Sequence, residues 1–122
     1  PTILVYGHYD VQPPGDEAEW QTPPFQPSVR DGRIYARGAT DDKGPVLVAL
    51  ETGRRLFAET GRLPLTVRFL MEGEEEIGST SLAGFRAAEN FTNVVAELLL
   101  GNCGHGPHGS RTATMRRRGA RE

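Results

Sequence analysis

Residues 2–10 read TILVYGHYD, a run of β-forming residues that ends in a glycine followed by polar side chains. The run lacks the polar alternation of a strand with one solvated face, so it predicts a strand buried on both faces. His8 and Asp10 lie two residues apart on the chain that leaves this strand, so their side chains can point the same way. The stretch therefore predicts a core strand with a polar pair at its carboxyl end.

A long helix and two more strands come after this first strand. Apolar residues recur at helical spacing over residues 43–57, and Thr60-Gly61 predicts where the helix stops. Residues 65–71 (LTVRFLM) and 93–100 (NVVAELLL) predict two further core strands, and Ser79 predicts the N-cap of a shorter helix between them. Strands and helices that alternate in this order predict an α/β fold: a partial, mostly parallel sheet flanked by helices.

Loops and a hairpin separate the first strand from the long helix. Residues 12–27 are rich in proline and have few regularly spaced apolar positions, so they predict an ordered loop, which we expect Trp20 and Phe25 to hold in place. Residues 28–35 predict a small hairpin that turns at Asp31-Gly32, because both residues tolerate a positive φ.

Composition excludes several classes of protein. With 122 residues, 25% of them charged and 37% hydrophobic, the chain suits one small soluble globular domain, or a piece of a larger one, rather than a disordered chain. Cys103 is the single cysteine, so no internal disulfide can form. No apolar stretch approaches the roughly 20 residues that span a bilayer, and residues 1–6 have neither the basic region of a signal peptide nor an initiator Met. We therefore expect a cytoplasmic protein that is cut at its front and has no membrane partner.

Charge divides the chain into two segments. Residues 101–122 hold five Arg and one Glu, whereas the first hundred residues hold nine basic and 15 acidic side chains. An acidic body repels the phosphate backbone of nucleic acids and is compatible with holding cations. We expect a folded region over residues 1–100 and, over residues 101–122, an atypical Gly- and Arg-rich tail that is disordered or translated out of frame.

Three clusters of possible metal ligands lie where ligands collect in parallel sheets, near the carboxyl ends of strands. His8 and Asp10 come after the first strand, residues 72–76 (EGEEE) come after the second, and Asp41-Asp42 precede the long helix. Each cluster alone has a plainer interpretation: a satisfied loop histidine, an exposed acidic loop and a helix cap, respectively. Because all three are of metal-ligand type and are expected near one edge of one sheet, together they predict a metal site.

Four motifs follow one another along the chain: residues 7–13 (GHYDVQP), Trp20 with Pro24-Phe25, residues 31–44 (DGRIYARGATDDKG) and residues 71–79 (MEGEEEIGS). In this order they resemble the zinc peptidases that include carnosine dipeptidases, acetylornithine deacetylase and succinyl-diaminopimelate desuccinylase. The resemblance covers roughly residues 1–90 and is closest to the dipeptidase branch. It implies that residues 1–100 are the N-terminal part of a metallopeptidase catalytic domain that cleaves an amide bond of a dipeptide or an acylated amino acid.

The resemblance also implies a role for each site residue. His8 would ligate one metal ion, Asp41 would bridge two, and Glu76 would ligate the second. Asp10 would orient His8, and Glu75 would be the general base that takes a proton from the water bridging the metals. The ions would be divalent, zinc first, with manganese or cobalt as options, and the pair would lower the pKa of the shared water and polarise the scissile carbonyl. The Asp41-Asp42 peptide bond is expected to be cis.

The sequence departs from the family beyond about residue 90. Family members are several times longer, with a further carboxylate ligand on the next strand, a late histidine ligand, and a second domain for substrate contacts and dimerisation. Glu97 is the only candidate for that carboxylate, but its spacing from Glu76 is short, which favours an edge or cap residue instead. We therefore expect little activity from these 122 residues alone. The alternative is a non-catalytic remnant that binds metal weakly, and the parent enzyme would be a homodimer through the absent domain.

Two further groups have weaker interpretations. Cys103, His105 and His108 could form a metal cluster, and the basic run 116–118 could bind anions, but a solvated Gly-rich tail accounts for both. An acidic calcium-binding domain is a third possibility, because carboxylates suit hard cations. His8 argues against it, and the D-x-D-x-D-G spacing of an EF-hand loop is missing.

Overall fold

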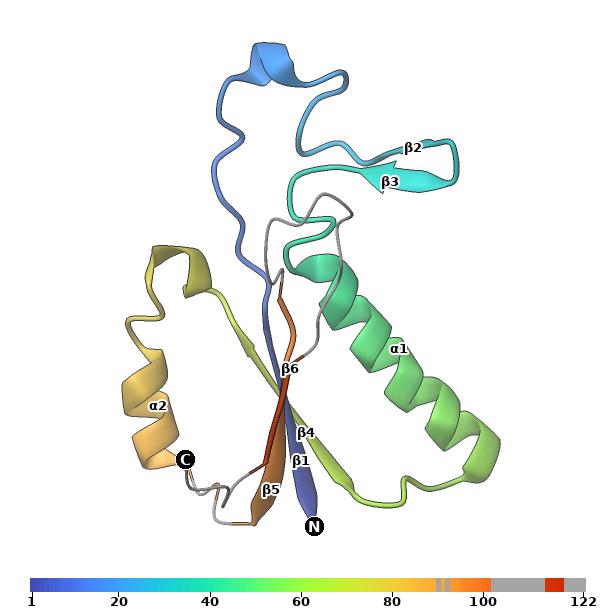
Figure 1. Cartoon of the computed structure of the whole chain (residues 1–122), viewed down its shortest axis with the longest axis vertical. Helices are drawn as coiled ribbons and strands as arrows, with labels where there is room; N and C mark the ends of the chain where they lie inside the picture. Colours follow the sequence, from blue (N-terminus) through green and yellow to red (C-terminus); the bar gives the residue numbers. More distant parts are fainter. Residues whose placement is uncertain (90, 92, 102–113, 118–122) are drawn as a thin grey trace.

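The protein is described by a computed structural model, in which residues 1–89, 91, 93–101 and 114–117 are placed. Its main sheet has the strand order β4-β1-β5-β6, and a separate hairpin lies beyond one end of the sheet (Figure 1). The sheet strands are β1 (Thr2–His8), β4 (Thr66–Glu72), β5 (Val94–Leu99) and β6 (Thr114–Arg117). The central strand β1 pairs in parallel with both β4 and β5, and β6 pairs antiparallel with β5. The expected α/β fold with a mostly parallel sheet is confirmed.

Two helices flank this sheet. They are α1 (Lys43–Thr60), between β1 and β4, and α2 (Leu82–Ala88), between β4 and β5. The chain moves from β1 to one neighbour and then back across β1 to the other. Since crossovers between parallel strands are almost always right-handed, this reversal places the two helices on opposite faces, as Figure 1 shows. The carboxyl ends of β1 and β4 meet at one edge, where His8 pairs with Glu72.

Local signals placed most of these elements correctly. Helix α1 ends where expected, because Gly61 takes a left-handed conformation (φ 69°) and its N–H bonds to the carbonyl of Phe57. The hairpin of β2 (Ser28–Arg30) and β3 (Arg33–Tyr35) turns at Asp31-Gly32, with φ values of 50° and 70°.

The expected N-cap of the second helix is wrong. The helix begins at Leu82 and its N-cap is Ser81, not Ser79. A single 3-10 turn, η2 (Glu75–Ile77), precedes it. The carboxylate of Glu74 accepts hydrogen bonds from the Ser81 N–H (2.9 Å) and the Thr80 hydroxyl (2.7 Å), and so takes the role expected of a cap side chain.

The proline-rich loop after β1 is held by one of the two expected aromatic residues. The Trp20 indole N–H donates to the carbonyl of Pro14 at 2.9 Å, and the loop includes one 3-10 turn, η1 (Glu17–Glu19). Phe25 is 58% exposed, so the expectation that it anchors the loop is wrong.

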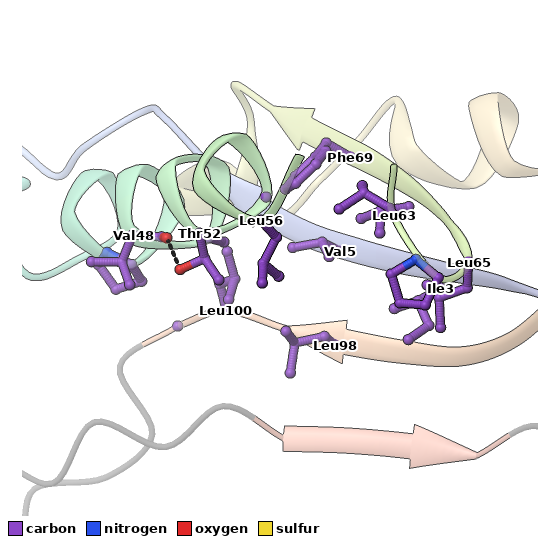
Figure 2. Close-up of a pocket in the computed structure, with 16 residues that line it drawn as sticks. Ile3, Val5, Val48, Thr52, Leu56, Leu63, Leu65, Phe69, Leu98 and Leu100 are labelled. Atoms are coloured by element: carbon purple, nitrogen blue, oxygen red, sulfur yellow. Dashed lines mark hydrogen bonds between the residues drawn. The ribbon is translucent and has the colours of Figure 1, made fainter. Parts of the chain in front are cut away.

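The tightest packing is on the central strands. Leu4, Val5 and Val94 are each at most 5% exposed, whereas α1 has no buried residue. Between α1 and the sheet lies an apolar cavity of about 520 Å³, and Figure 2 shows Val48 and Leu56 of α1 among its lining side chains. The long helix therefore covers the sheet without closing against it.

The described part of the chain contains no helix that is long and apolar enough to cross a membrane. Within the segment 101–122, Gly101 and strand β6 are described. The expected disorder of residues 102–113 and 118–122 falls outside the described residues.

Candidate metal centre

His8 is the centre of the site. It is the last residue of β1 and is 3% exposed. Its imidazole lies between two carboxylates, with Nδ1 3.2 Å from Oδ1 of Asp10 and Nε2 3.1 Å from Oδ1 of Asp41. The structure thus joins the segment after β1 to the segment before α1 through one histidine ring.

The turn after β4 brings two more carboxylates to this ring. Glu75 Oε2 is 3.9 Å from His8 Nε2. Potential ligand atoms of His8, Glu75 and Glu76 all lie within 4.8 Å of one another. Glu76 is held from the loop after β1, because Gln12 Nε2 donates to its Oε2 at 2.7 Å and Asp10 Oδ2 accepts its backbone N–H at 3.0 Å.

Asp42 does not have the capping role that the sequence left open for it. It occupies the N-cap position of α1, but its side chain makes no cap hydrogen bond. Instead it is fully buried, and its Oδ2 accepts the backbone N–H of His8 at 3.2 Å. The Asp41-Asp42 peptide bond is cis, as the resemblance implied.

Burial and the neighbouring charges shift the pKa values of the site residues. Burial raises the pKa of Glu75, and the nearby charges of Glu76 and Asp41 raise it further against the opposing effect of His8. Burial lowers the pKa of His8, but its hydrogen bond to Asp41 and the charge of Glu75 outweigh this effect and raise that pKa overall.

The pKa of Asp10 shifts in the opposite direction to that of Glu75. Burial raises it, but hydrogen bonds from backbone N–H groups, that of Glu76 first among them, leave it below its usual value. Asp10 therefore stays ionised beside the imidazole of His8.

The donor set fits a divalent cation. One buried imidazole faces several carboxylates, and imidazole with carboxylate is a usual ligand set for zinc. A cation among these groups would offset the repulsion from Glu76 and Asp41 that adds to the effect of burial on the pKa of Glu75. Five side chains expected at the site therefore lie together: His8, Asp10, Asp41, Glu75 and Glu76.

Other acidic candidates have structural partners. Glu97 of β5 forms an ion pair with Arg86 of α2 at 2.8 Å and is absent from the cluster of His8, Glu75 and Glu76. Glu72 accepts hydrogen bonds from the hydroxyls of Tyr6 and Ser79. The possible cluster of Cys103, His105 and His108, and the side chains of residues 116–118, lie outside what the structure describes.

Two contacts were missed at the sequence level. Gln12 belongs to the quoted GHYDVQP stretch, yet no spacing rule pairs it with Glu76 across 64 residues. The link from Asp42 to the N–H of His8 is equally remote in sequence. Both depend on the parallel pairing of β1 with β4 and on the return of α1 to the end of β1, which spacing alone does not give.

A known protein family matches most of this chain. The sequence profile of peptidase family M20/M25/M40 matches residues 4–111. The chain belongs to this family. The match runs past residue 100 into the segment set apart by its charge.

Individual members of the family show how far the likeness extends. The chain is 40% identical over 102 residues to the Beta-Ala-His dipeptidase of Rattus norvegicus, covering 82% of this chain and 21% of that protein. It is 39% identical over 120 residues to the cysteinylglycine-S-conjugate dipeptidase of Corynebacterium striatum, covering 98% of this chain and 26% of that protein. The chain thus spans about a fifth to a quarter of the length of these curated relatives.

A solved structure shares the fold. The M20 family metallo-carboxypeptidase Sso-CP2 from Sulfolobus solfataricus superimposes with a TM-score of 0.76 and 37% sequence identity. The match covers 88% of this chain and 24% of that one.

Proposed function

We propose that this chain carries half of the active site of a metal-dependent dipeptidase or related amidohydrolase, with residues 1–100 as the N-terminal part of the catalytic domain. The single observation that carries the proposal is the buried imidazole of His8, whose Nε2 faces Asp41 and Glu75. The relatives are named dipeptidases, which supports a small peptide or an acylated amino acid as substrate.

Each residue has a distinct proposed role. His8, Asp41 and Glu76 hold two divalent ions, zinc first, with manganese or cobalt as options. Bound there, such ions polarise the scissile carbonyl, lower the pKa of a water molecule and stabilise negative charge on the carbonyl oxygen. Asp10 holds Nδ1 of His8 and so leaves Nε2 as the ring atom that would bind an ion.

Glu75 is the proposed general base. The pKa of Glu75 is raised toward neutral pH relative to that of an ordinary carboxylate, which suits proton transfer in both directions. It takes a proton from the attacking water and gives it to the departing amine nitrogen as the C–N bond breaks. The side chain is exposed enough to reach substrate, since 44% of its surface is accessible.

A chimera tests this proposal. Residues 1–100 replace the aligned segment of the Corynebacterium striatum dipeptidase, and hydrolysis of a cysteinylglycine conjugate is measured with and without zinc. We expect zinc-dependent hydrolysis that Glu75→Gln removes. A folded chimera that retains zinc but never hydrolyses the substrate would contradict the proposal.

The isolated chain is proposed to have little activity of its own, and weak metal binding without catalysis is the second candidate. The ion pair of Glu97 with Arg86 favours this second candidate, because it directs the Glu97 side chain to α2. Calorimetry with zinc on the 122-residue chain separates the two candidates, because tight binding lost in His8→Ala and Asp41→Ala indicates a preformed half-site.

Compartment and assembly complete the proposal. The proposed compartment is the cytoplasm, whose reducing conditions suit a chain with a single cysteine. The parent enzyme is proposed to be a homodimer through another domain, which size-exclusion chromatography with light scattering on the parent protein tests.

A further inference from the structure

Asp42 raises a question that the proposed chemistry leaves open. Its side chain has 0% exposure, and its Oδ1 has no hydrogen-bond partner among the described residues. Burying a carboxylate with an unpaired oxygen costs free energy that an apolar residue of similar size would avoid. Capping of α1 does not explain it, because the side chain makes no cap hydrogen bond.

The one hydrogen bond that the Asp42 side chain makes within the described residues joins two elements. Its Oδ2 accepts the N–H of His8, which links the first turn of α1 to the last residue of β1. Gly7 makes this approach possible. A Cβ on Gly7 would lie 2.9 Å from Asp42 Oδ2 and 2.7 Å from Val46 Cγ2, so any larger residue would force one or both of these side chains to shift.

The same link lies directly beside two proposed metal ligands. His8 donates the hydrogen bond through its backbone, and Asp41 is the residue before Asp42. Across the link, His8 Nε2 and Asp41 Oδ1 are 3.1 Å apart. A shift of Asp42 relative to β1 would therefore change the separation of these two ligand atoms.

We propose that Asp42 is a positioning residue, whose buried carboxylate ties the start of α1 to the end of β1 and thereby sets the separation of His8 from Asp41. The link to metal binding rests on the proposed function. The positioning itself does not, and it can be measured without metal.

The first experiment uses the metal-free 122-residue chain and NMR. It follows hydrogen exchange of the His8 amide and the ¹⁵N shifts of the His8 imidazole, assigned with His8→Ala. In Asp42→Ala we expect the amide to exchange about tenfold faster, as for the loss of one hydrogen bond, and the Nε2 signal to move. Asp42→Asn retains a carbonyl oxygen that can accept the N–H, so it should keep both signals near their wild-type values.

Val46→Ala is the matched control. Val46 contacts the same Gly7 position, so its truncation removes packing there without removing the hydrogen bond. Both His8 signals should stay unchanged. If Val46→Ala disturbs them as much as Asp42→Ala does, side-chain volume rather than the carboxylate sets the spacing, and the proposal fails.

The second experiment measures zinc affinity of the same variants by calorimetry. Asp42→Ala should weaken zinc binding by about 10- to 100-fold, the range for residues that orient metal ligands. Asp42→Asn should bind zinc with an affinity near that of the wild type. Unchanged affinity in a folded Asp42→Ala variant overturns the proposal. If the wild-type chain binds no zinc while Asp42→Ala still moves the His8 signals, the positioning role is supported and the proposed metal centre of this chain is contradicted.

Gly7→Ala serves if Asp42→Ala fails to fold. It keeps the carboxylate but displaces it from the His8 N–H, so it should move the same His8 signals and weaken zinc binding in the same direction. A folded Gly7→Ala variant with wild-type signals overturns the proposal.

Discussion

Asp10 accepts a hydrogen bond of 3.0 Å from the backbone N–H of Glu76, 66 residues further along the chain. The other carboxylate oxygen of Asp10 lies 3.2 Å from Nδ1 of His8. One side chain therefore fixes both an imidazole and the backbone of a glutamate that comes from a different strand end. Movement of either partner breaks one of the two contacts.

Asp10→Ala should weaken zinc binding by about 10- to 100-fold, because it frees the His8 ring and the Glu76 backbone together. Asp10→Asn should have a smaller effect, since its carbonyl oxygen can still accept one N–H while the negative charge beside His8 is lost. Calorimetry at fixed pH measures both variants, and circular dichroism checks their folding. Equal affinity in folded Asp10→Ala and wild type would show that the two contacts do not orient the site.

Glu75→Gln and Glu76→Gln should separate base from ligand. In the chimera, Glu75→Gln should lower hydrolysis by about 10²- to 10⁴-fold, the usual contribution of a general base, with zinc content unchanged. Glu76→Gln should lower zinc affinity first and activity as a consequence. Zinc titration and initial rates on the same samples provide both readouts. Equal loss of zinc in both variants would mean that Glu75 is also a ligand, as its place in the cluster with His8 allows.

Tyr6 should make the fold sensitive to alkaline pH. Burial, together with its hydrogen bond to Glu72, raises the pKa of Tyr6 from 10.0 to about 12. The folded state holds this proton more tightly than the unfolded chain does. The resulting stabilisation is therefore complete below pH 10 and is lost as the pH rises through about 12.

The ultraviolet absorbance of phenolate measures this titration. The ionisation of Tyr6 should appear as a late step, and that step should be missing in Tyr6→Phe. Between neutral and strongly alkaline pH, the free energy of unfolding in urea should also fall less for Tyr6→Phe than for the wild type. A late step that survives in Tyr6→Phe would assign the raised pKa to another residue.

Two leucine truncations should differ in cost because the two side chains are buried to different extents. Leu4→Ala, at a site 2% exposed, should cost about 2–5 kcal/mol of unfolding free energy. Leu56→Ala should cost about 1 kcal/mol or less, because Leu56 is 45% exposed and already borders the cavity beneath α1. Urea denaturation of both variants measures the difference. Equal costs would mean that α1 closes against the sheet in solution.

Periodicity and turn chemistry predicted the elements because these signals are local. The β-forming run before Gly7, the helical spacing over α1 and the Asp31-Gly32 turn all act within a few residues. Ser79 was a wrong cap for the opposite reason. A carboxylate from outside the helix, that of Glu74, accepts the N–H and the hydroxyl of Ser81, and a serine at the right spacing does not reveal such a competitor.

The residue types of the candidate site could be predicted for a simple reason. Imidazole and carboxylate groups cluster after strands whose carboxyl ends meet. The sequence did not indicate how the groups hold one another. The contacts of Gln12 with Glu76 and of Asp42 with His8 appear only once β1 and β4 are paired, and neither has a sequence pattern of its own.

The parallel pairing of β1 with β4 also sets when the site can form. It matches Thr2 with Thr66 and His8 with Glu72, so a loop that includes all of α1 must close before the two strand ends meet. Closure of such a loop precedes the contacts that stabilise it, which makes parallel strands slow to assemble, whereas a helix forms from local contacts. A nascent chain would therefore have α1 in place while His8 and the acidic turn were still apart. Zinc added during refolding should then be taken up in step with sheet formation, so that metal acquisition follows the folding of the strands and does not start it.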